Sequence, residues 1–148
     1  MKEIIDTMSR HEELISRLYQ TYALTHPDMA EFWNLLSLQE IQHRDWLNNL
    51  AALVGTGKLH FDKDRFRIEP LRLAMEYIEQ ELYKAQHMAI PLEEALNKAL
   101  YIEESMIEQK FFEVFESDSV DMKHVLQNLE KETKGHIEMI RKERASLK

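Results

Sequence analysis

Glu40 and His43 are polar residues at positions where a helix should present apolar side chains. Along residues 29–54, apolar residues recur at spacings of three and four, namely Met29, Trp33, Leu36, Leu47, Leu50 and Val54. Such spacing places them on one helix face. Glu40 and His43 interrupt this face three residues apart, on successive helical turns. A carboxylate and an imidazole presented together in this way could bind a metal ion.

Glutamates also interrupt the apolar rows of two further predicted helices. Along residues 5–22, Glu12 is the one charged member of a row that otherwise consists of Ile5, Met8, Ile15, Tyr19 and Tyr22. Along residues 92–114, two neighbouring rows each contain one glutamate, Glu103 in the first and Glu104 in the second. The spacing alone leaves open which of these two points inward.

A fourth row, along residues 122–140, is interrupted by Thr133 and His136, with Glu132 beside it. Burying an unpaired carboxylate costs several kcal/mol, so glutamates at mid-helix in several rows need a compensating partner. A metal ion is the simplest one. Oxygen ligands combined with two histidines favour iron or manganese, while zinc more often uses fewer carboxylates.

Chance provides a simpler interpretation of each single motif. A single Glu-x-x-His pair is weak evidence, because an acidic helical protein with seven histidines can contain such a pair by chance. The remaining histidines lie off the rows or in connections and are expected to be solvated: His11, His26, His60, His87 and His124. Three glutamates near residue 80 are expected to form an exposed face: Glu76, Glu79 and Glu81. The coincidence of interruptions in four rows is what favours a metal site.

Five helices are predicted to position these residues within a single domain that spans residues 1–148. Their expected bounds are about 3–25, 27–54, 70–89, 91–116 and 120–145. All three prolines fall in first helical turns, where proline is tolerated. The connection at residues 55–69 has no periodicity and is expected to be a linker.

The lengths of the connections predict the topology. Very short connections make the first and second helices, and likewise the fourth and fifth, antiparallel hairpins. The long connection between the hairpins contains the third helix, whose apolar row must cover its own bundle or a neighbouring chain. Hairpin, long crossover and hairpin is the order of an all-α, ferritin-like four-helix bundle.

Composition excludes several other classes of protein. The net charge of -8 makes nucleic acid an unsuitable partner, because phosphate binding requires a basic face. The apolar runs are too short to span a membrane, and the N-terminal residues lack an apolar signal region, so we expect a cytoplasmic protein. The chain has no cysteine, which excludes disulfides and thiolate ligands. A metal would have to be held by His, Asp or Glu.

At these residues the chain resembles the rubrerythrin-type ferritin-like proteins. In that family the first bundle helix carries a ligand glutamate and an aromatic residue two turns later, as Glu12 and Tyr19 do here. The second helix carries Glu-x-x-His in a leucine frame, which Glu40 and His43 match. Residues 99–103, with Phe111 eight residues on, fit the third ligand helix and favour Glu103 over Glu104.

The last helix departs from the family pattern. Residues 129–136 resemble the final Glu-x-x-His segment, but Thr133 stands where the last glutamate is expected. Glu132, four residues before His136, could replace it, and Glu104 and Glu108 are further reserves. The chain also lacks a cysteine-ligated rubredoxin module, which implies a separate electron-transfer protein.

The resemblance implies a pair of metal ions, iron first, with manganese or zinc as alternatives. Glu40 would bridge the ions, with Glu12 and His43 holding one and Glu103 and His136 the other. Two ferrous ions could reduce peroxide or oxygen, so peroxide reduction or ferroxidase-like oxidation is the expected activity. Tyr19 and Tyr22 either donate hydrogen bonds to the site or, as aromatic residues of a bundle, belong to its core. Tyr19 and Glu40 are the expected catalytic residues. Related small chains often form homodimers.

Two rival interpretations stay open at the level of sequence. The first is a degenerate bundle that keeps the fold without the metal and acts as a structural or interaction module, which Thr133 favours. In that case Glu40 and His43 would pair with each other and with Glu12 or tyrosines. The second is a mononuclear zinc or manganese site without redox activity.

Overall fold

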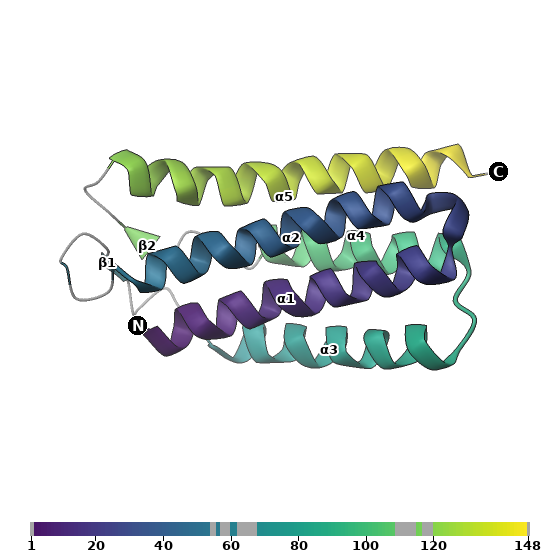
Figure 1. Ribbon diagram of the computed structural model, residues 1–148, viewed down its shortest axis with the longest axis horizontal. Helices are drawn as coiled ribbons and strands as arrows, with labels where there is room; N and C mark the ends of the chain where they lie inside the picture. Colours follow the sequence, from purple (N-terminus) through teal and green to yellow (C-terminus); the bar gives the residue numbers. More distant parts are fainter. Residues whose placement is uncertain are drawn as a thin grey trace.

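The computed structural model describes residues 2–53, 56, 60–61, 68–108, 115–116 and 120–147. These residues form five α-helices, which confirms the all-α class (Figure 1). Their bounds are α1 Lys2–Thr25, α2 Ala30–Ala51, α3 Ile68–His87, α4 Leu92–Glu108 and α5 Val120–Ser146. Among the described residues, every helix is too short or too polar to cross a lipid bilayer.

The start of α2 differs from the prediction. Residues Pro27–Met29, expected in the first turn of the second helix, form a separate 3₁₀ turn, η1. The backbone N–H of Met29 donates to the carbonyl of His26 at 2.9 Å, which closes this turn between α1 and α2. The predicted end of the helix, at Val54, lies outside the described residues.

The end of the fourth helix was predicted wrongly. Residues Phe115–Glu116, expected to be helical, form the short strand β2, which pairs antiparallel with β1 (His60–Phe61) in the expected linker. Phe61 faces Phe115 in the register. Residues 111–115 are rich in aromatic and β-branched types, which favour strands once a partner strand is present. That partner comes from a distant part of the sequence, so helical periodicity gave no sign of it.

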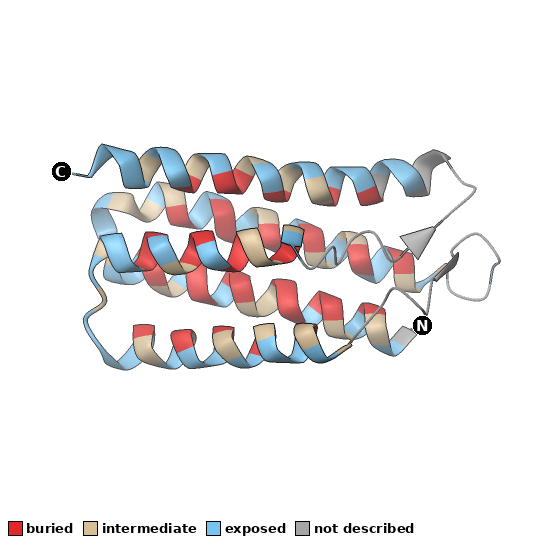
Figure 2. Ribbon diagram, turned by 180° about the vertical axis from the view of Figure 1, so that it is seen from behind, coloured by how far each residue is buried: buried red, intermediate tan, exposed pale blue. Residues whose placement is uncertain are grey.

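The helices lie side by side along one long axis (Figure 1). The chain runs forward in α1 and back in α2, then forward in α3, back in α4 and forward in α5, so that each hairpin is antiparallel. Buried residues lie on the faces that the helices turn toward one another (Figure 2). The core contains the predicted rows, including Ile15, Trp33, Leu96 and Leu129, all with no exposed surface.

The crossover helix α3 covers its own bundle. It packs mainly against α1 and more sparsely against α4. Leu71, Ile78 and Ala85 of its apolar row are buried there. The predicted row therefore has a partner within the chain.

Glu81 on α3 is buried, which corrects its assignment to an exposed face. Its exposure is 4%, whereas Glu76 and Glu79 are exposed as predicted. Glu81 lies three residues after Ile78 and four before Ala85, so it turns toward the bundle with them. One of its carboxylate oxygens lies 3.4 Å from the Nζ of Lys84 and 3.4 Å from that of Lys98 on α4. The pairing with Lys98 compensates the buried charge and links α3 to α4.

Candidate metal centre

Four helices bring five predicted ligands together in the interior. Glu12 comes from α1, Glu40 and His43 from α2, Glu103 from α4 and His136 from α5. All five are buried, with exposures between 0% and 2%. A charge at such a position needs partners within a few ångströms.

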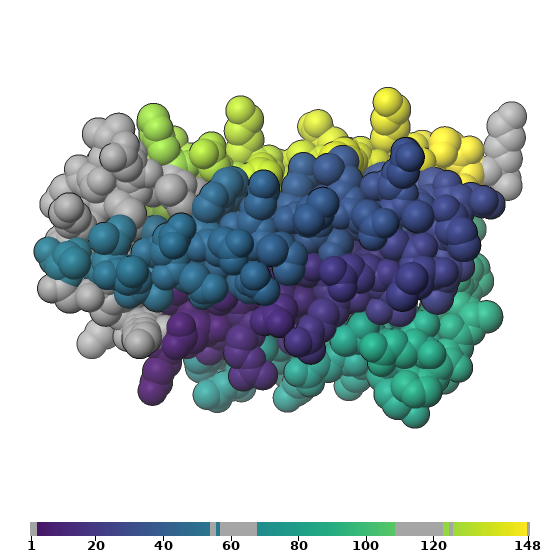
Figure 3. All heavy atoms as spheres, viewed as in Figure 1, coloured from purple at the N-terminus to yellow at the C-terminus, as the bar shows by residue number. Residues whose placement is uncertain are grey.

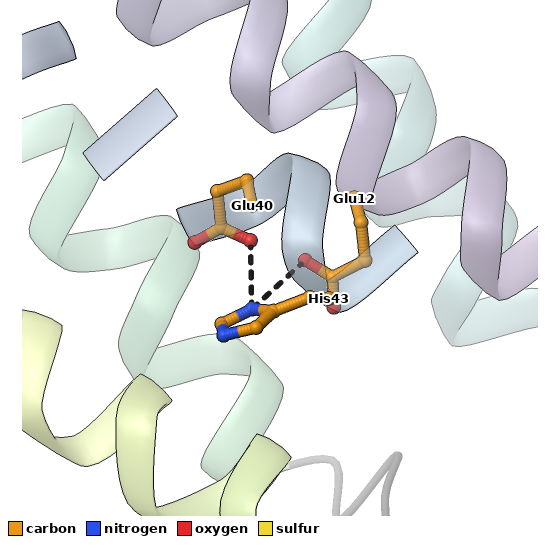
Figure 4. A group of neighbouring side chains, drawn as sticks. All are labelled: Glu12, Glu40 and His43. Atoms are coloured by element: carbon orange, nitrogen blue, oxygen red, sulfur yellow. Dashed lines mark hydrogen bonds and ion pairs between the residues drawn. The ribbon is translucent and has the colours of Figure 1, made fainter. Parts of the chain in front are cut away.

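Glu12, Glu40 and His43 form the first group (Figure 4). The Nδ1 atom of His43 lies 3.2 Å from Oε2 of Glu40 and 3.8 Å from Oε2 of Glu12. Each residue offers one ligand atom, and these atoms lie within 4.8 Å of one another. The Glu-x-x-His spacing on α2 places Glu40 and His43 on one face, and α1 supplies Glu12 from its antiparallel position.

Glu40, Glu103 and His136 form the second group. The Nδ1 atom of His136 lies 3.0 Å from Oε1 of Glu40 and 3.2 Å from Oε1 of Glu103. The ligand atoms of this group also lie within 4.8 Å of one another. Glu40 belongs to both groups and turns one oxygen to each histidine. The rings of His43 and His136 are stacked, with centroids 5.6 Å apart.

The outer nitrogens of the two imidazoles lie near polar side chains of α2 and α5. Nε2 of His136 contacts the side-chain oxygen of Gln39 at 2.5 Å, and Nε2 of His43 lies 3.6 Å from Oε2 of Glu132. Nε2 of His136 donates its proton to Gln39, and in that tautomer Nδ1 keeps its lone pair toward the carboxylates. Such outer contacts orient histidine ligands in metal sites. The sequence reasoning missed Gln39, whose one signal was its position beside Glu40.

The carboxylates carry buried oxygens that no protein group satisfies. Among the described residues, Oε2 of Glu12, Oε1 of Glu40 and Oε2 of Glu103 are buried without a hydrogen-bond partner. The 3.0 Å approach of His136 to Oε1 of Glu40 is an ion-pair contact without hydrogen-bond geometry. Unsatisfied buried oxygens cost free energy, and cations bound by the two groups could satisfy them. The donor set therefore fits one or two metal ions.

The electrostatics of the metal-free centre favour protons on the histidines. Burial lowers the pKa of His43, but Glu40 and Glu12 outweigh this and raise it to about 11. Glu103 and Glu40 likewise outweigh burial and raise the pKa of His136 to about 10. Burial and the adjacent Glu40 raise the pKa of Glu12 to about 7. Burial and Glu103 act to raise the pKa of Glu40, but contacts that include His43 and His136 outweigh them and lower it.

Tyr19 is placed at the centre, as predicted. Its hydroxyl donates to Oε1 of Glu103 at 2.8 Å, and the residue has no exposed surface. Burial and the charge of Glu103 raise the pKa of the Tyr19 hydroxyl well above its usual value, so the proton stays on the donor. Tyr22 packs against Trp33, with ring centroids 4.9 Å apart, and is part of the core.

Replacing Tyr19 by phenylalanine should lower the free energy of unfolding of the metal-free protein by about 2 kcal/mol, since a buried hydrogen bond to a carboxylate is lost. Urea unfolding at neutral pH measures the change. Tyr83→Phe is the control, because Tyr83 is 60% exposed on α3. Equal small effects in both variants would show that the bond to Glu103 contributes nothing.

The structure distinguishes Glu103 from its neighbour Glu104. Glu104 points outward, where its carboxylate pairs with Arg141 of α5 at 2.7 Å. Glu108, the other reserve, is exposed at the end of α4. Glu103 is therefore the inward glutamate of α4.

Thr133 and Glu132 lie outside both groups of ligand atoms. The Thr133 side chain is fully buried, and its hydroxyl donates to the carbonyl of Leu129 at 2.9 Å. Glu132 touches the outer nitrogen of His43 rather than the inner one. In this arrangement Glu132 lies beside His43 and outside both groups of ligand atoms, and its predicted role as a ligand would require its side chain to move.

His11 was expected to be solvated, and this prediction is wrong. The residue is 3% exposed on α1, and it lines a cavity of about 310 Å³ between α1, α3 and α4. Burial lowers the pKa of His11, although the charge of Glu12 acts in the opposite direction. His11 lies off the apolar row of α1 and is buried by the packing of α3. The periodicity of α1 does not predict that packing. His87 and His124 are exposed as predicted, and the side chain of His60 lies outside the described part.

Known proteins provide no assignment for this centre. No protein-family model, curated protein or solved structure matches the chain at a significant level. Its chemistry therefore has to be argued from the geometry.

Proposed function

We propose that the chain is a ferritin-like protein of rubrerythrin type that binds a pair of iron ions and reduces peroxide or oxidises ferrous iron. One observation carries the proposal. Glu40 turns its two carboxylate oxygens to two buried groups, each completed by one further glutamate and one histidine. A carboxylate shared between two groups of this kind is the arrangement of di-metal bundles.

The topology supports the ferritin-like part of the proposal. Two antiparallel hairpins, α1–α2 and α4–α5, are joined by a crossover that contains α3, and the candidate ligands come from the four hairpin helices. Bundles with one long crossover and inward-facing Glu and Glu-x-x-His ligands have this order. The donor set of carboxylates and two imidazoles suits iron or manganese better than zinc.

The chain's own residues would hold and orient the ions. Glu12 and His43 would hold one ion, Glu103 and His136 the other, and Glu40 both. When bound, two ferrous ions would supply two electrons, which together with two protons reduce hydrogen peroxide to two water molecules. Tyr19 fixes Glu103 through its hydrogen bond, and Gln39 fixes the His136 imidazole from outside. Glu132 lies 3.6 Å from the outer nitrogen of His43. Burial of all five ligands excludes bulk water from the site. A separate redox protein would then supply the electrons that return the ions to the ferrous state.

The decisive experiment measures metal content. The metal-free protein is loaded with ferrous iron without oxygen, and iron per chain is determined after desalting. About two irons per chain, with a ferric absorption band that appears on adding peroxide and disappears on adding reductant, is the expected result. A chain that retains no iron, manganese or zinc would overturn the proposal.

The candidate ligand set has three carboxylates, whereas the rubrerythrin-type pattern has four, and Thr133 occupies the position of the fourth. Replacing Thr133 by glutamate should increase the affinity for the more weakly bound ion by about tenfold or more, because it adds a charged ligand near His136. Thr133→Gln is the matched control, with similar size and no charge. Titrations of both variants with manganese separate the outcomes, and equal affinities would show that no ligand is missing.

A structural or interaction module is the second candidate function. The observation that favours it is the pair of contacts at Glu40, whose two oxygens lie 3.2 Å from Nδ1 of His43 and 3.0 Å from Nδ1 of His136. With protons on these imidazoles, the histidines would neutralise carboxylate charge without a metal. In that case the chain would bind no metal, and neutral replacements at Glu40 and His43 made together would leave folding unimpaired.

A further inference from the structure

α2 and α5 share a border on the surface of the bundle (Figure 3). α1 and α2 are packed closely as a hairpin, as are α4 and α5, and α3 lies over α1 beside α4. α2 and α5 lie next to each other with sparse contact. Both reach the surface along their shared border (Figure 3).

A groove of about 410 Å³ follows this border and reaches the centre. It is lined by Gln39, Trp46, Asn128, Lys131, Glu132, Gly135, His136 and Met139. Gln39 and Glu132 are the residues that contact the outer nitrogens of the two imidazoles. The floor of the groove is therefore the outer edge of the candidate metal centre.

Gly135 is a glycine in the middle of α5, and it lines this groove. Glycine inside a helix costs about 1 kcal/mol relative to alanine. Close packing does not require it, because a Cβ atom at this position would meet no atom within 4 Å. Its backbone is helical, so no unusual conformation requires it either. What the missing side chain provides is open space in the groove.

The lining offers oxygen atoms to an incoming cation. Glu132 is a carboxylate whose side chain is 29% exposed, so it faces both the solvent and His43. Gln39 and Asn128 add amide oxygens. Divalent cations with a preference for oxygen bind such groups while they lose water.

We propose that the groove between α2 and α5 is the route by which divalent metal ions reach the buried carboxylates, and that Gly135 keeps it open. The inference rests on the proposed function, because it requires that the centre binds metal. Glu132 is the first carboxylate that an ion meets on this route.

The test measures how fast the metal-free protein takes up Co²⁺, followed by the visible absorption of the bound ion. Gly135→Phe fills the groove and should slow uptake by about tenfold or more, equivalent to at least about 1.4 kcal/mol in the activation barrier. The final amount of bound cobalt should not change. Glu138→Phe is the matched control, since it adds the same side chain at an exposed position of α5. Gly135→Leu replaces Gly135→Phe if circular dichroism shows that the larger variant does not fold.

A second variant tests the rival route. Ala74→Phe adds the same side chain to the cavity that α3 lines beside His11. Slow uptake in Ala74→Phe with normal uptake in Gly135→Phe would overturn the inference and place the route there. Wild-type uptake rates in both Gly135 variants would also overturn it and leave the proposed function intact. A wild-type chain that binds no cobalt, iron or manganese would overturn the proposed function itself.

Discussion

Replacing Glu40 by glutamine should abolish binding of both metal ions, whereas the same change at Glu12 or Glu103 should remove only one. Glu40 is the single residue that belongs to both groups of ligand atoms. An amide offers one neutral oxygen in place of two charged ones, so neither ion keeps its shared ligand. Since even outer partners of metal ligands are worth 10 to 100-fold in affinity, loss of this shared ligand should cost about 100-fold or more for each ion.

Metal per chain after loading and desalting measures this result, together with a cobalt titration of each variant. Glu104→Gln is the matched control, because Glu104 is the adjacent glutamate of α4 and pairs with Arg141 at the surface. It should retain both ions. Two tightly bound ions in the Glu40 variant would contradict the bridging role, and loss of metal from the Glu104 variant would contradict the assignment of Glu103.

Residues whose environment is set by their own helix could be predicted from the sequence. Glu12, Glu40, His43 and His136 interrupt apolar rows, and helical geometry alone turns them inward with those rows. Glu103 and Glu104 are adjacent in sequence, and their own helix could not separate them. The position of α5 does so, since Arg141 holds Glu104 at the surface.

The errors concern residues whose environment comes from another part of the chain. His11 and Glu81 are buried because α1, α3 and α4 pack together, a contact that no local pattern encodes. Gln39 was overlooked because its partner, His136, is 97 residues away. Phe115 was assigned to a helix because the strand that pairs with it lies near residue 60. Local periodicity predicts the face of a helix, and tertiary packing decides what covers that face.

The stability of the metal-free protein should fall steeply as pH rises from 6 to 9. In the unfolded chain His43 and His136 titrate near the usual histidine pKa of 6.5, whereas in the folded chain their pKa values are about 11 and about 10. A histidine with a raised pKa stabilises the fold fully below the unfolded pKa, and this contribution is lost as pH rises through the folded value. The pKa of Glu12 is raised from 4.5 to about 7, so this carboxyl group also makes the folded state less stable as pH rises. The combined loss should be on the order of several kcal/mol.

Urea unfolding at a series of pH values measures this slope. In His43→Gln, the folded state should bind about one proton fewer relative to the unfolded state. The free energy of unfolding should then fall by about 1.4 kcal/mol less for each pH unit above 7. The control is His124→Gln, since His124 is exposed on α5 and should leave the slope unchanged. A flat profile in the wild-type protein would show that the buried histidines are neutral without metal.

Metal binding should reverse this dependence on pH, because ligand histidines must be neutral and ligand glutamates ionised. At pH 7 the metal-free centre holds a proton on each histidine and a partial one on Glu12, so saturation should release about two to three protons per chain. Calorimetric titration with manganese in buffers of different ionisation enthalpy counts them. The affinity should therefore increase with pH over the same range in which the metal-free fold loses stability. Metal binding without proton release would show that the ions bind away from His43 and His136, and would separate the metal-binding proposal from the site assigned to it.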